Sequence, residues 1–358
     1  MKISSNGVQI HVDDQGKGTP IVFLHYWGGS SRTWEEVIAA LEGNYRTIAP
    51  DLRGWGDSDA PATGYALADF ANDAQHMIDA LDLQQYVLVG HSMGGKIAQL
   101  LASRCPRGLA GLVLVAPSPP VPLLLPPEVR VAMEGAYISR ESVGTAIDQM
   151  LAGKALSPKH REQVIEDSLR GAPQAKAAWP KATGLENITR EVGAISVPTI
   201  VIAGEIDRID SIATLKAELL PLVPHAVLQV VPGTGHLSPL ESPAEVAGFI
   251  RQFVESLELA VTVTLRMTVK DELADEFVAG LPTLMRETSS LPGARSVRAL
   301  RDTGSENAIL FVEEWDSADA FRAYIEWRTN RGDMDRLGHM LSKPPEIITW
   351  SSTANALA

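Results

Sequence analysis

The sequence predicts an α/β domain over residues 1–258 with a helical lid, followed by a smaller α+β domain over residues 259–358. Three observations support this division. Apolar strand-like segments alternate with helix-like segments through most of the first 258 residues, as in α/β folds. That rhythm is interrupted between Ala116 and about Ile195. Near Leu259 a different, two-residue alternation of apolar and polar side chains begins, which is typical of a half-exposed strand.

The strand-like segments of the first part are short and several are almost continuously apolar, which favours strands buried on both faces of a mostly parallel sheet. They are Val8–Val12, Pro20–Leu24, Arg46–Ala49, Tyr86–Val89, Gly111–Val115, Pro198–Ala203 and Ala226–Val231. The helix-like segments between them are Thr33–Leu41, Leu67–Leu81, Gly95–Ser103 and Pro243–Glu255. The segment from Ala116 to about Ile195 is rich in proline and helix formers and contains no clear strand. We expect residues 118–190 to form a helical lid over the sheet.

Residues 259–358 predict the order βαββαβ, which is that of a ferredoxin-like domain. The segments are a strand in LAVTVTLRMTV, a helix over Asp271–Arg286, strands near Ser296–Arg301 and Ala308–Trp315, a helix over Ser317–Thr329 and a strand near Glu346–Ser351. No long linker separates the two parts, since the junction falls within residues 255–260.

Composition excludes several classes of partner. The chain has 358 residues, 45% of them hydrophobic, and a net charge of −13, so neither nucleic acid nor an anionic membrane is an expected partner. Cys105 is the only cysteine, which fits a reducing compartment. The start of the chain, MKISSNGVQI, lacks the apolar run of a signal peptide, and prolines interrupt the most apolar stretch, residues 108–127. We therefore expect a cytoplasmic protein.

The stretch Gly90-His91-Ser92-Met93-Gly94 fits G-x-S-x-G between a strand and a helix. This context is that of a nucleophile elbow, in which a tight turn raises the serine hydroxyl above the sheet. Side chains two positions to either side of the serine would clash with neighbouring elements, so glycine is required there. Ser92 is the candidate nucleophile.

A serine hydroxyl needs a base, and the base needs an orienting carboxylate. His236, in PGTGHLSPLESP, follows the strand-like segment Ala226–Val231 and is the candidate base. Asp207, in IVIAGEIDRID, follows the preceding strand and is the candidate acid, with Glu205 and Asp210 as alternatives. The chain order serine, aspartate, histidine places all three in loops after strands, where they can meet at one edge of the sheet.

Acyl transfer also requires donors for an oxyanion. The loop HYWGG follows the strand Pro20–Leu24, and we expect the backbone N–H groups of Trp27 and Met93 to be these donors. His25 is expected to hydrogen-bond within its loop, and His91 to be a packing residue beside the nucleophile.

Residues 1–258 resemble the α/β-hydrolase superfamily, in its branch of lidded esterases and cofactor-free haloperoxidase or perhydrolase relatives. The motifs that carry the resemblance are HYWGG, DLRGWGDSD, GHSMGG, GEIDRID and GTGHLSPLESP. The chain departs from many relatives in having Tyr26 where they have glycine, and a tyrosine there would narrow or shape the pocket. Relatives that act on haloalkanes or epoxides use an aspartate nucleophile, so Ser92 argues against both activities.

The resemblance implies a serine hydrolase acting on an ester or related acyl compound, without cofactor or metal. A small apolar substrate is expected, because the lid carries the run Leu123–Leu125 and aromatic side chains. The candidate pocket residues are Tyr26, His91, Tyr137, Trp179 and Leu237. The same residues could serve lactone opening, cleavage of a C–C bond next to a carbonyl, or perhydrolysis. A third hypothesis is a binding protein that keeps the hydrolase fold as a receptor.

The last hundred residues resemble the antibiotic-biosynthesis-monooxygenase-like (ABM) domains. The matching residues include Leu291-Pro292-Gly293, the run RALRD at 298–302 and FVEEW at 311–315. Such domains usually pair through their sheets, so we expect a homodimer formed through this domain. Trp315 is expected in the core, and Tyr324, where haem-degrading members have a histidine, argues against haem. A cofactor-free oxygenase using Trp315 and Tyr324 is the alternative.

Overall fold

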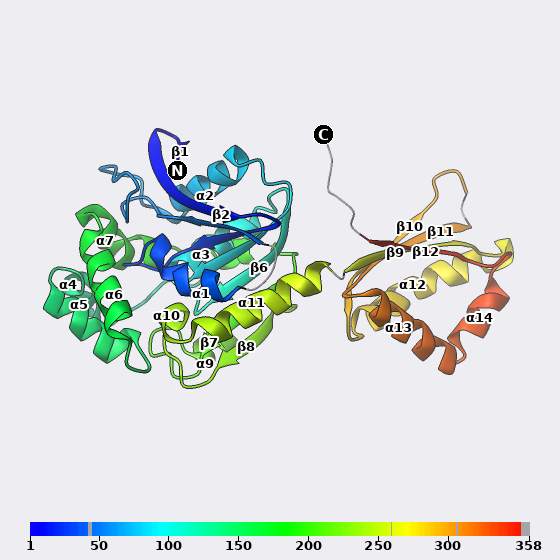
Figure 1. Cartoon of the computed structure of the whole chain (residues 1–358). Coiled ribbons are helices and arrows are strands. Elements are labelled where there is room, and N and C mark those ends of the chain that lie inside the picture. The colour runs from blue at the N-terminus through cyan, green and yellow to red at the C-terminus, as the bar shows by residue number, and fades with distance from the viewer. Residues whose placement is uncertain (42–44, 259, 306, 352–358) are drawn as a thin grey trace. The chain divides into compact units, whose positions relative to one another are not determined.

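The computed structural model describes residues 1–41, 45–258, 260–305 and 307–351. The chain divides into two compact units, Met1–Phe253 and Val254–Ala358 (Figure 1). In the described residues, no helix is both long enough and apolar enough to cross a lipid bilayer.

The first unit is built on an eight-stranded sheet in the order β1-β2-β4-β3-β5-β6-β7-β8. Its strands are β1 (Lys2–Ser5), β2 (Val8–Gly16), β3 (Thr19–Leu24), β4 (Tyr45–Pro50), β5 (Tyr86–His91), β6 (Leu109–Val115), β7 (Thr199–Gly204) and β8 (Val227–Val231). The pairs β1–β2 and β2–β4 are antiparallel, and every pair from β4 to β8 is parallel. Parallel strands whose two faces are both covered explain the continuous apolar runs of β3, β5 and β7.

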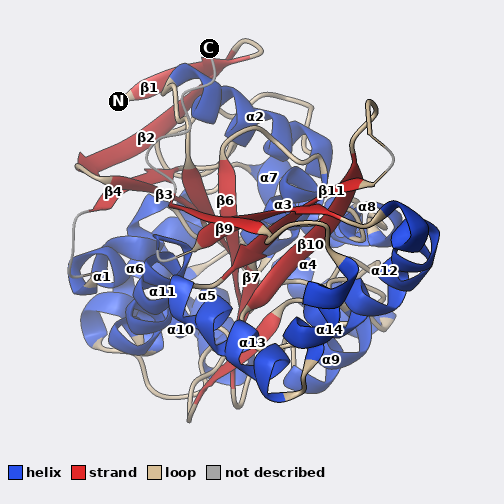
Figure 2. Ribbon diagram, turned by 90° about the vertical axis from the view of Figure 1, so that its right-hand side faces the viewer, coloured by secondary structure: helices blue, strands red, loops and turns tan. Residues whose placement is uncertain are grey.

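Helices cover both faces of this sheet, with α1 and α11 on one side and α2 and α3 on the other (Figures 1 and 2). Outside the lid the helices are η1 (Ser31–Trp34), α1 (Glu35–Ala40), α2 (Leu67–Ala80), α3 (Met93–Ser103), α9 (Ile212–Glu218), α10 (Ser238–Glu241) and α11 (Pro243–Glu258). The predicted helix Thr33–Leu41 is in fact a 3₁₀ turn followed by a short α-helix. The sequence interpretation also missed β1 and α9, each of which is too short for its periodicity to stand out.

The segment between β6 and β7 is helical, as predicted, and residues 116–195 contain no strand. Its elements are α4 (Pro127–Gly135), α5 (Arg140–Ala146), the π-helical turn η2 (Ile147–Leu151), α6 (Pro158–Arg170), α7 (Pro173–Lys181), η3 (Thr183–Leu185) and α8 (Thr189–Val192). We call residues 118–190 the lid. Tyr137, Val143, Ile147, Val164 and Trp179 belong to the same buried cluster as the sheet residues, so the lid shares the core of the unit.

The second unit has a four-stranded antiparallel sheet in the order β10-β11-β9-β12, with helices packed on one face. Its elements are β9 (Val261–Thr268), η4 (Asp271–Leu273), α12 (Ala274–Ser289), β10 (Ala294–Arg301), β11 (Ala308–Trp315), α13 (Ala318–Asn330), α14 (Asp333–Met340) and β12 (Glu346–Ser351). This is the predicted ferredoxin-like order with one addition, the helix α14. Alternate residues of β9 such as Val263 and Leu265 are buried against Phe311 and Phe321, whereas Arg266 is exposed on the other face.

The turn between β5 and α3 brings the backbone of the elbow directly against neighbouring backbone. Ser92 has a φ of +53°, a left-handed conformation that strains a residue with a side chain. A Cβ atom added to Gly94 would lie 2.4 Å from the carbonyl oxygen of Leu24, and one added to Gly90 would lie 2.3 Å from that of Gly94. The clash predicted from the sequence is therefore confirmed, and it involves backbone atoms that have no rotamer with which to move aside.

We expect Gly94→Ala to destabilise the protein by about 2–3 kcal/mol or to prevent folding, because an overpacked core with no room to relax costs that much or more. Denaturant unfolding followed by circular dichroism measures the change. Gly248→Ala is the matched control, because nothing lies within 4 Å of a Cβ added there in α11. That variant should gain about 0.5–1 kcal/mol as a helical Gly→Ala change. Equal stabilities for the two variants would contradict the backbone clash.

Candidate active site

Ser92, His236 and Asp207 form a continuous hydrogen-bonded chain at the carboxyl ends of β5, β7 and β8. The Ser92 hydroxyl donates to His236 Nε2 at 2.8 Å, and His236 Nδ1–H donates to Asp207 Oδ2 at 2.9 Å. All three side chains are buried, and Ser92 is only 7% exposed. The structure thus brings together the three residues selected from the sequence.

Glu205 and Asp210, the two alternative candidates for the acid, do not hydrogen-bond to His236. Asp207 Oδ1 accepts the backbone N–H groups of Ile209 and Asp210, at 2.7 and 3.1 Å, so both of its oxygens are engaged. Glu205 instead accepts the backbone N–H of Gly233 at 2.8 Å. Asp210 is buried but makes no hydrogen bond with His236, whose Nδ1–H goes to Asp207.

Burial and charge act in opposite directions on His236. Burial lowers the pKa of the imidazole, whereas the adjacent Asp207 carboxylate raises it through both its charge and its hydrogen bond. The net effect is a pKa above the usual histidine value. Stabilisation of the charged imidazole is what a residue needs if it is to accept a proton from Ser92.

The loop after β3 runs beside the nucleophile elbow. The carbonyl oxygens of Leu24 and His25 would be 2.4 and 2.6 Å from a Cβ on Gly94. Within the described residues no hydrogen bond is made by the backbone N–H of Trp27 or of Met93, the first residue of α3. Free N–H groups at the start of a helix and in a neighbouring loop can donate hydrogen bonds to an anion.

The two neighbouring histidines are structural. His25 Nδ1–H donates to Tyr26 O and its Nε2 accepts the N–H of Leu52, so the expected loop role of His25 is confirmed. His91 is fully buried, and its Nε2–H donates to the carbonyl oxygen of His236 at 2.8 Å. Burial holds the pKa of His91 well below the usual value, and the imidazole is therefore a neutral support for the His236 loop.

The candidate pocket residues are all buried, at 0–4% exposure, and each packs closely: Tyr26, His91, Tyr137, Trp179 and Leu237. Tyr26 stacks near His91, with ring centres 5.1 Å apart. Tyr137 reaches from the lid to the loop after β3, where its hydroxyl donates to Trp27 O at 2.9 Å and its ring lies 4.1 Å from that of Trp27. Their role as a substrate pocket stays a prediction.

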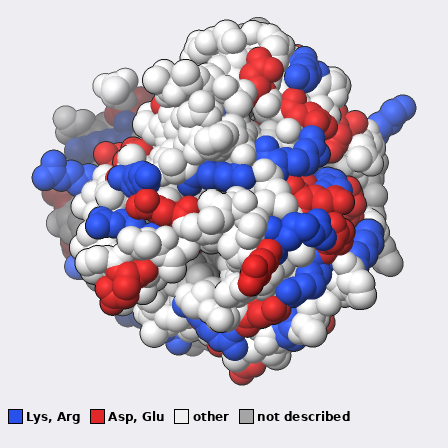
Figure 3. All heavy atoms as spheres, turned by 90° about the vertical axis from the view of Figure 1, so that its left-hand side faces the viewer, with Lys and Arg blue, Asp and Glu red and all other residues white. Residues whose placement is uncertain are grey.

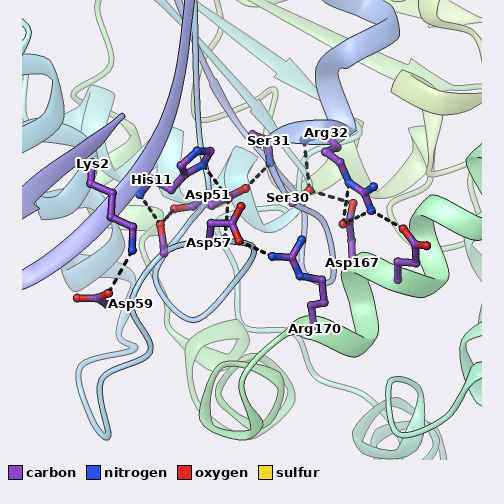
Figure 4. Close-up of polar contacts among 12 residues, drawn as sticks. Lys2, His11, Ser30, Ser31, Arg32, Asp51, Asp57, Asp59, Asp167 and Arg170 are labelled. Carbon is purple, nitrogen blue, oxygen red and sulfur yellow. Dashed lines mark hydrogen bonds and ion pairs between the residues drawn. The ribbon is translucent and has the colours of Figure 1, made fainter.

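Helix α6 of the lid is fastened to the same loop (Figure 4). The Asp167 carboxylate accepts the Ser30 hydroxyl at 2.9 Å and the Arg32 guanidinium at 2.6 and 3.1 Å. Ser168 donates to Gly28 O, and Gln163 donates to Arg32 O. Burial raises the pKa of Asp167, although Arg32 lowers it. We call the contacts of Asp167 with Ser30 and Arg32 the Asp167 clamp. It went unnoticed in the sequence because Asp167 is 137 and 135 residues away from these two partners.

A second fastening joins the lid to the His236 loop. The Glu241 Oε2 atom accepts three backbone N–H groups, from Gly153, Lys154 and Gly235, at 2.9–3.1 Å. His236 N–H also donates to Leu151 O. The lid therefore holds the loops on both sides of Ser92.

His11, Asp51 and Asp57 are the described residues whose side-chain atoms could approach a metal ion together, within 4.8 Å of one another. Asp51 is already used by the chain (Figure 4): one oxygen accepts Ser31 N–H, and the other accepts Asp57 N–H and contacts His11 Nδ1. This arrangement braces the loops after β3 and β4 and does not need an ion.

The lid end of the first unit carries mixed charges. Lys and Arg side chains are interspersed with Asp and Glu over the face in Figure 3. Arg140–Glu162, Arg161–Asp148 and Lys159–Glu36 are ion pairs of exposed side chains in this region. Such pairs contribute little stability individually.

The comparison with known families decides the classification. Residues 21–249 match the model of the "Alpha/beta hydrolase family". The chain belongs to the alpha/beta hydrolase family. Residues 260–326 match "Antibiotic biosynthesis monooxygenase", so the second unit is an ABM domain. The two resemblances drawn from sequence motifs are confirmed.

Individual relatives cover the hydrolase part. A non-heme haloperoxidase of Rhodococcus erythropolis is 31% identical over 275 residues, which are 71% of this chain and 98% of the relative. An esterase structure from Exiguobacterium antarcticum matches with a TM-score of 0.66 and 26% identity, over 71% of this chain and 98% of that one. Est816, described as an N-acyl homoserine lactone degrading enzyme, matches with a TM-score of 0.64 and 30% identity, over 71% and 100% of the two chains.

We expect Asp167→Ala to lower the free energy of unfolding by about 1–3 kcal/mol, because it leaves buried donors without their acceptor. Thermal or denaturant unfolding measures it. Glu166→Ala is the control, since Glu166 also pairs with Arg32 but its side chain is 48% exposed. The free energy of unfolding of Glu166→Ala should stay within about 0.5 kcal/mol of the wild-type value. A loss for Glu166→Ala as large as that for Asp167→Ala would show that the clamp is not specific to Asp167.

Proposed function

We propose that this chain is a serine hydrolase that cleaves a carboxylic ester or a related acyl compound through an acyl-enzyme. The observation that carries the proposal is the hydrogen-bonded chain from Ser92 through His236 to Asp207, set on a strained elbow. Membership of the hydrolase family and the likeness to an esterase and to a lactone-degrading enzyme support the same reaction class.

In the proposed mechanism, Ser92 Oγ attacks the substrate carbonyl while His236 Nε2 takes the hydroxyl proton. Asp207 keeps the imidazole in the tautomer that accepts at Nε2 and stabilises the imidazolium that forms. The N–H groups of Trp27 and Met93 receive the oxyanion. His236 then returns the proton to the leaving alcohol, and a water molecule activated by His236 hydrolyses the acyl-enzyme.

The alternative is perhydrolysis, lactone opening or C–C cleavage by the same residues. Similarity to a non-heme haloperoxidase favours the first of these, and similarity to Est816 favours the second. A panel of simple esters, lactones and β-diketones, with and without peroxide, separates the possibilities by kcat/KM. Turnover faster than roughly 1 s⁻¹ on any of them excludes a receptor without activity.

We expect an active-site phosphonate to label Ser92 alone and to abolish hydrolysis of an aryl acetate. The reason is that only a hydroxyl deprotonated by a neighbouring base attacks such a reagent readily. Peptide mass spectrometry locates the label, and Ser92→Ala provides the unlabelled control. Label on another residue, or an unlabelled but active protein, would contradict the proposal.

Asp207→Asn should reduce kcat by about 10⁴-fold with the fold retained, as the corresponding change does in serine proteases. Asparagine keeps the size of the side chain but no longer stabilises the imidazolium. Glu205→Gln is the matched control, because Glu205 is exposed and lies on the same loop. If Glu205→Gln suffers the large loss and Asp207→Asn does not, the acid has been misassigned.

The acid limb of kcat/KM should lie above the usual histidine pKa, because His236 must be neutral to act as a base and its pKa is raised. Activity therefore falls as pH decreases through that raised value. Removing the negative charge in Asp207→Asn should move this limb to lower pH. A limb that stays in place in the variant would show that another group controls it.

We also propose that the ABM domain forms a homodimer through the sheet face opposite its helices. This face exposes Leu300, Ile348 and Trp350, at 50%, 38% and 51%. A hollow of about 440 Å³ lies on it, lined in part by Arg266 and Leu310. Pairing two such faces about a two-fold axis would bury them both. Trp315 and Tyr324, the alternative oxygenase residues, instead stack at 4.8 Å within the core, and Trp315 is fully buried.

The double variant Leu300→Asp with Ile348→Asp should convert a dimer into a monomer, because buried unpaired carboxylates are costly at an interface. Size-exclusion chromatography with light scattering reads the mass. Val131→Asp, which changes a 68% exposed side chain of α4 in the lid, should leave the dimer intact. A full-length chain that is already monomeric would end this part of the proposal.

A further inference from the structure

Asp210 is a buried carboxyl group beside the hydrogen-bonded residues that the proposed mechanism does not use. It lies three residues after Asp207, in the loop between β7 and α9, and is 3% exposed. Its backbone N–H donates to Asp207 Oδ1 at 3.1 Å, which fixes the position of the residue relative to the site.

The Asp210 carboxyl differs from the other buried aspartates of the described chain. Asp51, Asp73, Asp167 and Asp207 all accept hydrogen bonds from side chains or backbone N–H groups. Among the residues that the structure describes, none donates a hydrogen bond to the carboxyl group of Asp210. The completely enclosed side-chain atoms that lack a partner in the described chain, such as His91 Nδ1 and Gln99 Oε1, do not include the Asp210 oxygens, which therefore still border accessible space. An unpaired carboxylate that borders accessible space next to reactive residues can accept a hydrogen bond from a partner outside the chain.

The charged groups around Asp210 are already engaged elsewhere. His236 uses one ring nitrogen for Asp207 and the other for Ser92. Lys96 is fully buried on α3, and its ammonium group donates to the carbonyl oxygens of Val121 and Gly184. These two groups and Asp207 are the charges that act on Asp210. Burial raises the pKa of Asp210 to about 7, so both of its protonation states are populated near neutral pH.

We propose that Asp210 is a specificity-determining residue that accepts a hydrogen bond from an O–H or N–H group of the substrate close to the scissile carbonyl. The inference rests on the proposed function, because the position of Asp210 matters through its proximity to Ser92 and His236. It also refines the expected substrate, which is apolar apart from this one donor group.

Two pairs of phenyl esters with acyl groups of equal size test the inference on the full-length protein. They are phenyl 2-hydroxypropanoate with phenyl 2-methylpropanoate, and phenyl 3-hydroxybutanoate with phenyl 3-methylbutanoate. Each kcat/KM is divided by the rate constant of the same ester with hydroxide, which removes intrinsic reactivity. The wild type should prefer the hydroxylated ester of at least one pair by about 10- to 100-fold, as sites built for a hydrogen bond do.

Asp210→Val should reduce that preference to about one, and Asp210→Asn, which keeps an acceptor oxygen, should retain part of it. The preference of the wild type should grow between pH 6 and pH 8, because the ionised carboxylate is the better acceptor. A merely structural role would not change this ratio. Glu218→Gln is the matched control: it alters an exposed carboxylate at the end of α9, and the preference should be unchanged.

The possible failures are distinguishable. A wild type that cleaves both esters of each pair equally, or an Asp210→Val variant that keeps the preference, overturns the inference alone. A wild type that cleaves none of the four esters, and whose Ser92 takes up no phosphonate, overturns the proposed function and the inference with it. Thermal unfolding checks that Asp210→Val is folded, which we expect because valine removes an unpartnered polar group.

Discussion

The arrangement of the site depends on one steric constraint, the contact between the first turn of α3 and the end of β3. With no side chain at Gly90 or Gly94, the helix approaches the strand until backbone meets backbone. The same approach forces Ser92 into its left-handed conformation, which points its hydroxyl away from the sheet and toward His236. It also sets the path of the chain leaving β3, and so the place of the loop that carries Trp27.

The lid also fixes the loops that surround Ser92. Asp167 holds the loop after β3, and Glu241 joins residues 153–154 of the lid to the loop of His236. These contacts hold the loops of Trp27 and His236 in place, and stabilisation of an oxyanion depends on donors that are already in position. Among the described residues near Ser92, the N–H groups of Trp27 and Met93 and the carboxyl of Asp210 make no hydrogen bond within the protein, and neither do His91 Nδ1 and Glu241 Oε1.

Sequence reasoning found the features whose signal is local. Ser92 lies in a five-residue motif, and Asp207 and His236 follow apolar strands, so their positions above the sheet follow from topology. The choice of Asp207 over Glu205 and Asp210 needed the motif, and the hydrogen-bond geometry agrees with it. The Asp167 clamp and the contact of Tyr137 with Trp27 could not be found this way, since each joins residues more than 100 positions apart through side-chain packing. The short elements β1, α9 and α14 are defined by tertiary packing more than by periodicity.

The single oxygen of Glu241 that receives three N–H groups has a consequence for how new specificities could be built on this scaffold. Two of those donors belong to the lid and one to the His236 loop, so the carboxylate of Glu241 holds the lid and the loop together. A lid transplanted from a homologue would have to present two adjacent backbone donors at positions 153 and 154, whatever its other sequence. A recombination breakpoint between residues 151 and 154 would place Leu151, which accepts the N–H of His236, and the donors at positions 153 and 154 in segments of different origin. A breakpoint before residue 151 would keep all of these contacts with the native His236 loop.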